Sequence, residues 1–249
     1  MTPMKRVAVR WLCMGVMAWV AGAGVAQATL VLEGTRIVYP EKAKDVSIRV
    51  RNPGSYPILA QSWLDDGRPD LSPEVMVVPF IVSPALTRVE PDGSALLRVF
   101  HAKRPLPTDR ESLFYLNVME TPPRSSEENA LTLQFRTRVK LFFRPTGLSG
   151  DAGDAPDSLK WTLVPGAGAV EVHNPTPYHV SFLSVELETA GRREILDRAG
   201  QDAMVAPFSK LRFPVSAGRN PVPGQSQIHY WAINDFGGRH SYQRPLSLP

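Results

Sequence analysis

This sequence is almost without cysteine. A single cysteine, Cys13, occurs in 249 residues, and it lies in an apolar segment near the N-terminus. The rest of the chain therefore has no thiol with which to form a disulfide. Many exported proteins, small ones above all, depend on disulfides for stability. Beyond its first residues, this chain must rely on packed apolar cores alone.

An excess of charge of either sign is also missing beyond residue 28. Residues 1–28 hold three of the 28 basic residues and none of the 24 acidic ones, which leaves 25 basic against 24 acidic residues. The pI of 9.3 for the whole chain therefore says little about the remainder. A net charge of +1 does not indicate a nucleic-acid partner.

Long hydrophobic runs are absent with one exception. Lys5, Arg6 and Arg10 accompany an apolar run at residues 11–25, and Ala-Gln-Ala follows at 26–28. A basic region, an apolar region and a small-residue site in this order predict a signal peptide at residues 1–28, cleaved after Ala28. A membrane anchor would need about 20 apolar residues. No second run of spanning length follows, so we expect no stable membrane insertion.

Motifs for catalysis are missing as well. No histidine shows HExxH spacing or a cysteine partner, and neither a Gly-x-Ser-x-Gly elbow nor a glycine-rich phosphate loop occurs. The acidic pairs Asp65-Asp66 and Glu127-Glu128 lie in turn-like sequence and are predicted to be solvated. We therefore expect no catalytic residue, no metal and no cofactor. The histidines are His101, His173, His179, His229 and His240.

Proline and glycine are frequent instead, with 24 and 18 residues, while apolar residues make up 43% of the chain. Short segments between such breakers predict an all-β protein. Residues 29–147 predict one immunoglobulin-like sandwich, the small polar residues 148–157 a linker, and residues 158–249 a second β-sandwich domain. The candidate strands are residues 30–38, 45–52, 58–64, 75–78, 81–82, 94–100, 113–118, 131–143, 161–164, 169–173, 180–188, 204–205, 210–214 and 227–234.

The most distinctive strand is predicted at residues 131–143. Its apolar residues alternate with polar or charged ones, which is the period of a strand with one apolar face. Lys140 lies on the polar face of this strand, and Arg36 lies in the first predicted strand. Charged residues in strands most often face solvent. The alternative is that Arg36 and Lys140 converge on an anion, and spacing alone does not decide between the two.

Several motifs resemble those of the PapD-like family of periplasmic pilus-assembly chaperones. Together they span nearly the whole chain after residue 28, and they occur in the order that the family shows. They are residues 34–40 (Gly-Thr-Arg-Ile-Val-Tyr-Pro), 50–53 (Val-Arg-Asn-Pro), 106–118, 140–145 (Lys-Leu-Phe-Phe-Arg-Pro), 174–178 (Asn-Pro-Thr-Pro-Tyr), 206–209 (Ala-Pro-Phe-Ser) and 233–238 (Ile-Asn-Asp-Phe-Gly-Gly).

The resemblance implies two immunoglobulin-like domains arranged as an L and a non-enzymatic function in the periplasm. The expected partners are pilus subunits, whose groove the long strand fills, and an outer-membrane usher. Weak self-association through the exposed strand is a further possibility. The implied site residues are the carboxylate anchor Arg36 and Lys140, the groove-filling Leu131, Leu133 and Phe135, and the interdomain ionic network of Glu111, Arg144 and Asp235.

Two further points qualify the resemblance. The loop at about residues 120–130 is short, and no cysteine follows residue 13, as in the short-loop branch of the family, which serves rod-like or thicker pili. The competing function is a secreted binding or adhesin-like module that shares only the sandwich architecture, because a fold does not determine function.

Overall fold

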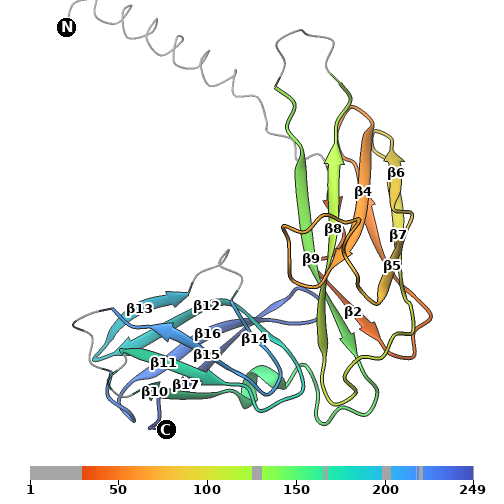
Figure 1. Ribbon diagram of the computed structural model, residues 1–249. Helices are drawn as coiled ribbons and strands as arrows, with labels where there is room; N and C mark the ends of the chain where they lie inside the picture. The colour runs from red at the N-terminus through yellow and green to blue at the C-terminus, as the bar shows by residue number, and fades with distance from the viewer. Residues whose placement is uncertain are drawn as a thin grey trace, which may run out of the picture.

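The computed structural model describes residues 30–248 except residues 125–130, 165, 167, 198–202, 217, 219 and 220. The predicted signal peptide and the pair Glu127-Glu128 lie outside the described residues. Figure 1 shows two β-sandwich domains that meet at one end and form an L. The predicted all-β fold class is confirmed. Within the described residues the one helical element is the short 3-10 turn η1 (Ala155–Ser158).

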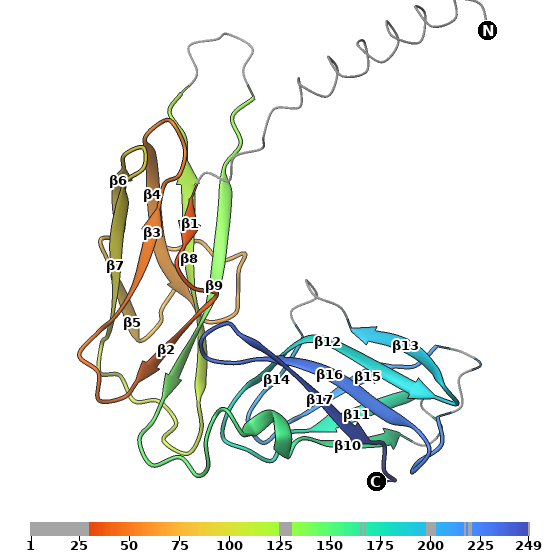
Figure 2. The same cartoon turned by 180° about the vertical axis from the view of Figure 1, so that it is seen from behind.

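The first domain packs two sheets against each other. Figure 2 shows its four-stranded sheet from the opposite side. That sheet contains, in spatial order, β1 (Val31–Leu32), β3 (Val46–Arg51), β7 (Ser94–His101) and β5 (Phe80–Ser83). The five-stranded sheet contains β2 (Arg36–Pro40), β9 (Phe135–Arg144), β8 (Ser112–Thr121), β4 (Ile58–Asp65) and β6 (Leu86–Val89).

Alternation along the strands builds the core of this domain. In β3, buried Ile48 and Val50 alternate with exposed Ser47 and Arg49. Because successive side chains of a strand point to opposite faces, such a strand supplies one row to the core and one row to solvent. The first core is filled in this way from both sheets, with Val50, Leu97, Val99, Leu116 and Leu141 fully buried.

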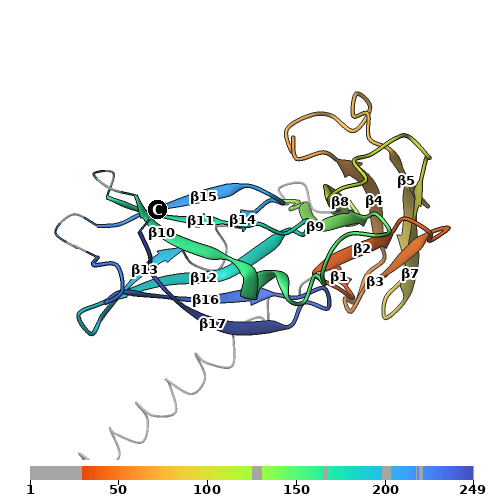
Figure 3. The same cartoon turned by 90° about the horizontal axis from the view of Figure 1, so that it is seen from below.

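The second domain has the same two-layer design, which Figure 3 shows from below. Its core surrounds Trp161, which packs against Phe182, Phe213 and Tyr230. The smaller sheet contains β10 (Lys160–Val164), β11 (Ala169–His173) and β15 (Lys210–Pro214). The larger sheet contains β13 (Arg192–Asp197), β12 (Val180–Thr189), β16 (Gln227–Ile233) and β17 (Arg239–Pro245), with β14 (Met204–Val205) pairing with β12.

The long strand begins later than predicted. The prediction placed its start at residue 131, but β9 begins at Phe135, and its first pair is with Glu120 of β8. The chain after β8 runs into Pro122-Pro123, and proline has no N–H to donate to a ladder. Residues 131–134 therefore lie beyond the last backbone pair, although the Gln134 side chain donates to Thr121 Oγ1 at 2.9 Å.

Other predicted strands also differ from the strands of the structure. The segment predicted as one strand at residues 30–38 divides into β1 and β2, which belong to different sheets. Residues 75–78 form no strand, because the prolines on both sides, Pro73 and Pro79, confine them to a loop in which Val75 and Val77 are exposed. Within the part of the chain that the structure describes, three strands were missed, namely β6, β13 and β17.

The predicted linker, residues 148–157, is only partly exposed to solvent. Ala155 and Pro156 in η1 are buried, and Ala155 belongs to the second core. Tyr178 of the second domain donates its hydroxyl to the Gly150 carbonyl at 3.0 Å. Residues 148–157 are thus partly folded onto the second domain.

Candidate functional site

Two cations of the first domain lie side by side where it meets the second domain. Arg36 is the first residue of β2, and Lys140 lies in β9. The two strands pair in parallel, and Arg36 and Lys140 are register partners. Lys140 is only 8% exposed in spite of its charge. The structure therefore brings together the two residues whose convergence the sequence left open.

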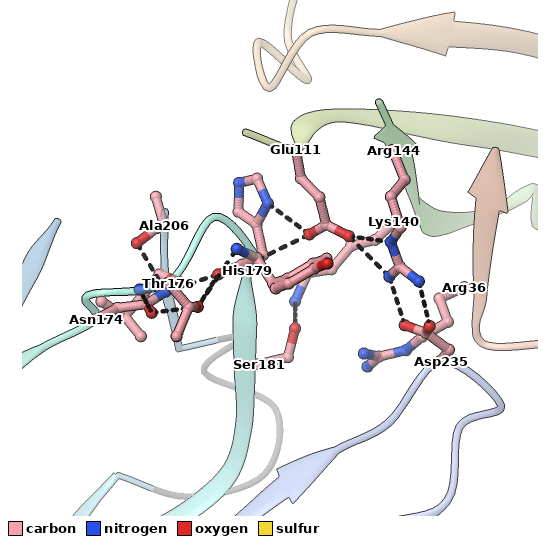
Figure 4. A network of polar contacts seen from close by, with 12 residues as sticks. Arg36, Glu111, Lys140, Arg144, Asn174, Thr176, His179, Ser181, Ala206 and Asp235 are labelled. Carbon is pink, nitrogen blue, oxygen red and sulfur yellow. Dashed lines mark hydrogen bonds and ion pairs between the residues drawn. The ribbon is translucent and has the colours of Figure 1, made fainter. Parts of the chain in front are cut away.

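The second domain contributes a matching pair of residues. Arg36 Nη1 donates to the Ile233 carbonyl at 3.0 Å. Lys140 Nζ lies 3.5 Å from Ser181 Oγ, at the outer limit of a hydrogen bond (Figure 4). Ser181 and Ile233 are themselves register partners, on β12 and β16. One pair from each domain thus faces the other across the junction.

A cavity of about 620 Å³ opens beside these pairs. Four of its lining residues are cations, Arg36, Arg138, Lys140 and Arg239, and no carboxylate is among the described residues that line it. Such a cavity favours an anionic group through charge-assisted hydrogen bonds. Its other lining residues are Thr35, Tyr115, Leu183, Ile233, Gly237 and Gly238.

Arg144, the last residue of β9, links the two domains. Its Nε donates to Glu111 at 2.8 Å, and its Nη1 and Nη2 donate to Asp235 at 2.7 and 3.0 Å (Figure 4). Glu111 also accepts the backbone N–H of His179 at 2.8 Å. Burial alone would lower the pKa of Arg144, but Asp235 and Glu111 outweigh it and raise this pKa. The three residues of the expected ionic network therefore meet at the boundary.

The apolar residues expected to fill a partner's groove are exposed. Leu131, Leu133 and Phe135 are 84%, 56% and 57% exposed. Only Phe135 belongs to β9, and Leu131 and Leu133 precede it. Phe135 has the same parity as Val139 and Leu141, which are buried in the first core. The side chains on the core-facing side of β9 therefore extend beyond the core of the first domain, and those at its start are exposed to solvent.

β9 also presents an open edge in the same region. β8 pairs with β9 along residues 135–143, but β2 pairs only with Lys140–Arg144. Among the described strands, none pairs with the other edge of residues 135–139. Figures 1 and 2 show this half of β9 pointing away from the second domain. An open strand edge is a template for pairing with another chain.

Sequence reasoning missed several residues of this region. The prediction that Asp65 is a solvated turn carboxylate was wrong: its side chain is 1% exposed and accepts two hydrogen bonds from Arg138. Ser181 and the Ile233 carbonyl carry no signal in the sequence. Leu183 reaches the cavity at a bulge between Phe182 and Ser184, where the extra residue changes the direction of the side chains.

An open edge with exposed apolar side chains, next to a cationic cavity, defines this molecule as a two-domain β-sandwich binding protein. The chain belongs to the PapD family of pilus-assembly chaperones. Residues 29–149 match the family model described as "Pili and flagellar-assembly chaperone, PapD N-terminal domain", and residues 154–244 match "Pili assembly chaperone PapD, C-terminal domain". This membership decides against an adhesin-like module that shares only the architecture.

Individual relatives cover nearly the whole chain. The probable fimbrial chaperone YadV of Escherichia coli K12 is 42% identical in an alignment of 219 residues that covers 85% of this chain and 87% of that relative. The crystal structure of the Pseudomonas aeruginosa CupB2 chaperone is 45% identical, with a TM-score of 0.74, and covers 87% of this chain and 100% of its own.

A third relative was solved with a partner. The Salmonella enterica SafB chaperone, in complex with the SafA pilin, is 28% identical with a TM-score of 0.72, and the match covers 90% of this chain and 99% of that one. The branch with a short loop before β9 stays a prediction, because residues 125–130 lie outside the described part of the chain. No helix within that part is long and apolar enough to cross a membrane.

Proposed function

We propose that this protein is a periplasmic chaperone that binds pilus subunits by donor-strand complementation and prevents their premature polymerisation. One observation carries the proposal: exposed Leu131, Leu133 and Phe135 lead into a strand whose edge is open at residues 135–139. Membership in a family of fimbrial chaperones supports it, as does the complex of the similar SafB chaperone with a pilin.

The strand and its side chains supply two kinds of interaction. The backbone of residues 135–139 pairs with a strand of the subunit, in the manner of strand addition to a sheet edge. Leu131, Leu133 and Phe135 enter the groove that an incomplete subunit sandwich leaves open. Burying each side chain contributes about 1.5–3 kcal/mol before the costs of ordering are subtracted.

The cationic cavity gives the complex its register. In this proposal Arg36 and Lys140 bind the C-terminal carboxylate of the subunit, since both are cations that line the same cavity and are neighbours across β2 and β9. A carboxylate accepts several charge-assisted hydrogen bonds at once. Because Lys140 is also the point at which β2 stops pairing, the anchor lies where the open edge begins.

The remaining steps of this proposal are those that the family resemblance implies. Residues 1–28 direct export as a signal peptide, and the loaded chaperone delivers its subunit to an outer-membrane usher. Exchange of β9 for the N-terminal segment of the next subunit drives release, so that no cofactor and no catalytic step is needed. The same open edge predicts weak self-association of the unloaded protein.

Hydrogen exchange on a purified complex tests the proposal. The protein is co-expressed with a pilus subunit from the same genome, and amide exchange is measured with and without the subunit. We expect new protection at residues 135–139, with little change in β3 and β7. Protection confined to the second domain in a stable complex would contradict donor-strand complementation.

A further inference from the structure

A buried carboxylate lies on the outer face of the five-stranded sheet. Asp65, the last residue of β4, is fully buried, and four donors satisfy it. Arg138 donates through Nε at 2.9 Å and Nη2 at 2.5 Å, Asn117 Nδ2 donates at 2.8 Å, and the Gly67 N–H donates at 2.7 Å. A carboxylate has about four acceptor sites, so the hydrogen-bonding capacity of Asp65 is filled.

The network continues from Asp65 to a second arginine of β9. Asn117 donates to Asp65 and accepts from Arg136 Nε at 2.9 Å, so it bridges the two. Arg136 Nη1 also donates to the Pro69 carbonyl at 2.8 Å. Both arginines lie near aromatic rings, with Arg138 Cζ 3.4 Å from the centre of the Tyr115 ring and Arg136 Cζ 5.1 Å from that of Trp63.

These contacts lie at the part of β9 that has the least other support. Arg136 and Arg138 belong to residues 135–139, which pair with β8 but not with β2. On the opposite face of this half-strand, Phe135 and Thr137 are exposed, so the core holds it only at Val139. A strand with one paired edge and few buried contacts is expected to fray. The side-chain network is the main additional restraint that the described residues provide.

We propose that Asp65 and Asn117 are positioning residues that hold residues 135–139 extended in the unloaded protein, ready to pair with a subunit. The inference rests on the proposed role of β9 as the donor strand. Ordering a segment in advance increases affinity, because the loss of conformational freedom is met during folding rather than during binding. Asp65 and Asn117 act through Arg138 and Arg136 and do not themselves touch the subunit.

Amide exchange of the unloaded protein tests this role without any partner. Asp65→Asn keeps the size of the side chain and removes its charge. Hydrogen bonds to charged groups are strong enough that their loss should raise exchange at the β9 amides bonded to β8 by about tenfold or more. Exchange in β3 and β7 should rise by a clearly smaller factor. Asp45→Asn is the matched control, because Arg98 forks onto Asp45 on the opposite sheet at 3.2 and 2.7 Å.

A second variant covers the case in which Asp65→Asn does not fold. Arg136→Gln changes a partly exposed side chain whose Nη2 lies 3.6 Å from Asp65 Oδ2, and it should raise exchange at the same amides by a smaller factor. Unchanged exchange at residues 135–139 in a folded variant would overturn the proposal. So would a uniform rise across the first domain, which would make Asp65 a residue of general stability.

Subunit capture separates this inference from the proposed function. In co-expression, the fraction of captured subunit should fall in the order of the exchange rates, while Asp45→Asn should behave like the wild type. Faster exchange with undiminished capture would overturn the link to binding. Failure of the wild type to capture any subunit would contradict the proposed function and leave the exchange result standing as a property of β9.

Discussion

Arg144 and Asp235 come from different domains, and the guanidinium of one forks onto the carboxylate of the other at 2.7 and 3.0 Å. Arg144 ends the strand proposed to be lent to subunits, and Asp235 lies in the turn between β16 and β17. A planar guanidinium suits such a bidentate contact. The orientation of the second domain is thus tied directly to the end of β9.

Replacing Arg144 should weaken this contact between the two domains. Arg144→Ala leaves Glu111, which is 2% exposed in its side chain, and Asp235 without their shared cation. We expect the free energy of unfolding to fall by about 1–3 kcal/mol and small-angle scattering to show a broader range of domain arrangements. Arg88→Ala, which breaks an exposed pair with Glu90, should change neither. An unchanged scattering profile and unchanged stability would mean that Arg144 does not hold the junction.

The anchor residues should be needed for binding but not for folding. Arg36→Ala and Lys140→Ala each remove one cation of the cavity, and each lost charge-assisted hydrogen bond costs about 1.5–3 kcal/mol. Co-purification of subunit should be lost while the circular dichroism spectrum is retained. Arg239→Ala removes a cation from the same cavity that is not part of the register pair, and it should reduce capture much less. Wild-type capture by either anchor variant would exclude the proposed carboxylate site.

The exposed apolar residues should matter strongly for subunit binding and little for the stability of the unloaded protein. Replacing Leu131, Leu133 and Phe135 by Ser removes side chains that are more than half exposed, so the melting temperature of the unloaded protein should change little. Subunit capture should fall sharply, because the groove loses its filling. Val77→Ser, at a loop residue that is 68% exposed, is the control. A large loss of stability with capture intact would show that these three residues serve the protein's own core.

Acid should weaken the network around Asp65. Burial would raise the pKa of Asp65, but hydrogen bonds from Arg138, Asn117 and the Gly67 N–H outweigh it and lower this pKa below its ordinary value of 3.8. A carboxyl group whose pKa is lowered by folding contributes stability above its unfolded pKa, and the contribution is lost as the pH falls toward its folded pKa.

The free energy of unfolding of the wild type should therefore exceed that of Asp65→Asn at neutral pH. This difference in free energy should become smaller below about pH 4. Urea unfolding at several pH values, with Asp45→Asn as the matched variant on the opposite sheet, measures the gap. A gap that stays constant down to pH 2 would contradict a lowered pKa at Asp65.

The turn that carries Asp235 should not tolerate a larger residue at Gly237. Gly237 has φ +81°, and a Cβ there would lie 2.7 Å from Thr35 Oγ1 of the first domain. Gly237→Ala should therefore strain the turn and push the domains apart at this contact. Scattering should show the same broadening as Arg144→Ala, whereas Gly191→Ala, in a turn with open space around it, should leave the domain arrangement unchanged.

Part of this molecule was predictable because local patterns decide it. The predicted bounds of β3 and β15 agree with the structure to within one residue, and both strands alternate, since burial on one face of a strand depends on the side chains of that strand. The missed strands lack this signal. β17 has no fully buried residue, and β13 buries only Asp197, so their pairing follows from the partner strands rather than from their own sequences.

The amino-acid sequence by itself determined two β-sandwich domains, an alternating apolar row within residues 131–143, and the chemical types of the site residues. Only the tertiary structure decided that Arg36 and Lys140 are neighbours, because parallel pairing joins strands that are distant in the chain. It also decided that Asp65 is buried and compensated, whereas its sequence neighbours suggest a solvated turn. Both depend on contacts between separate segments, which no local pattern encodes.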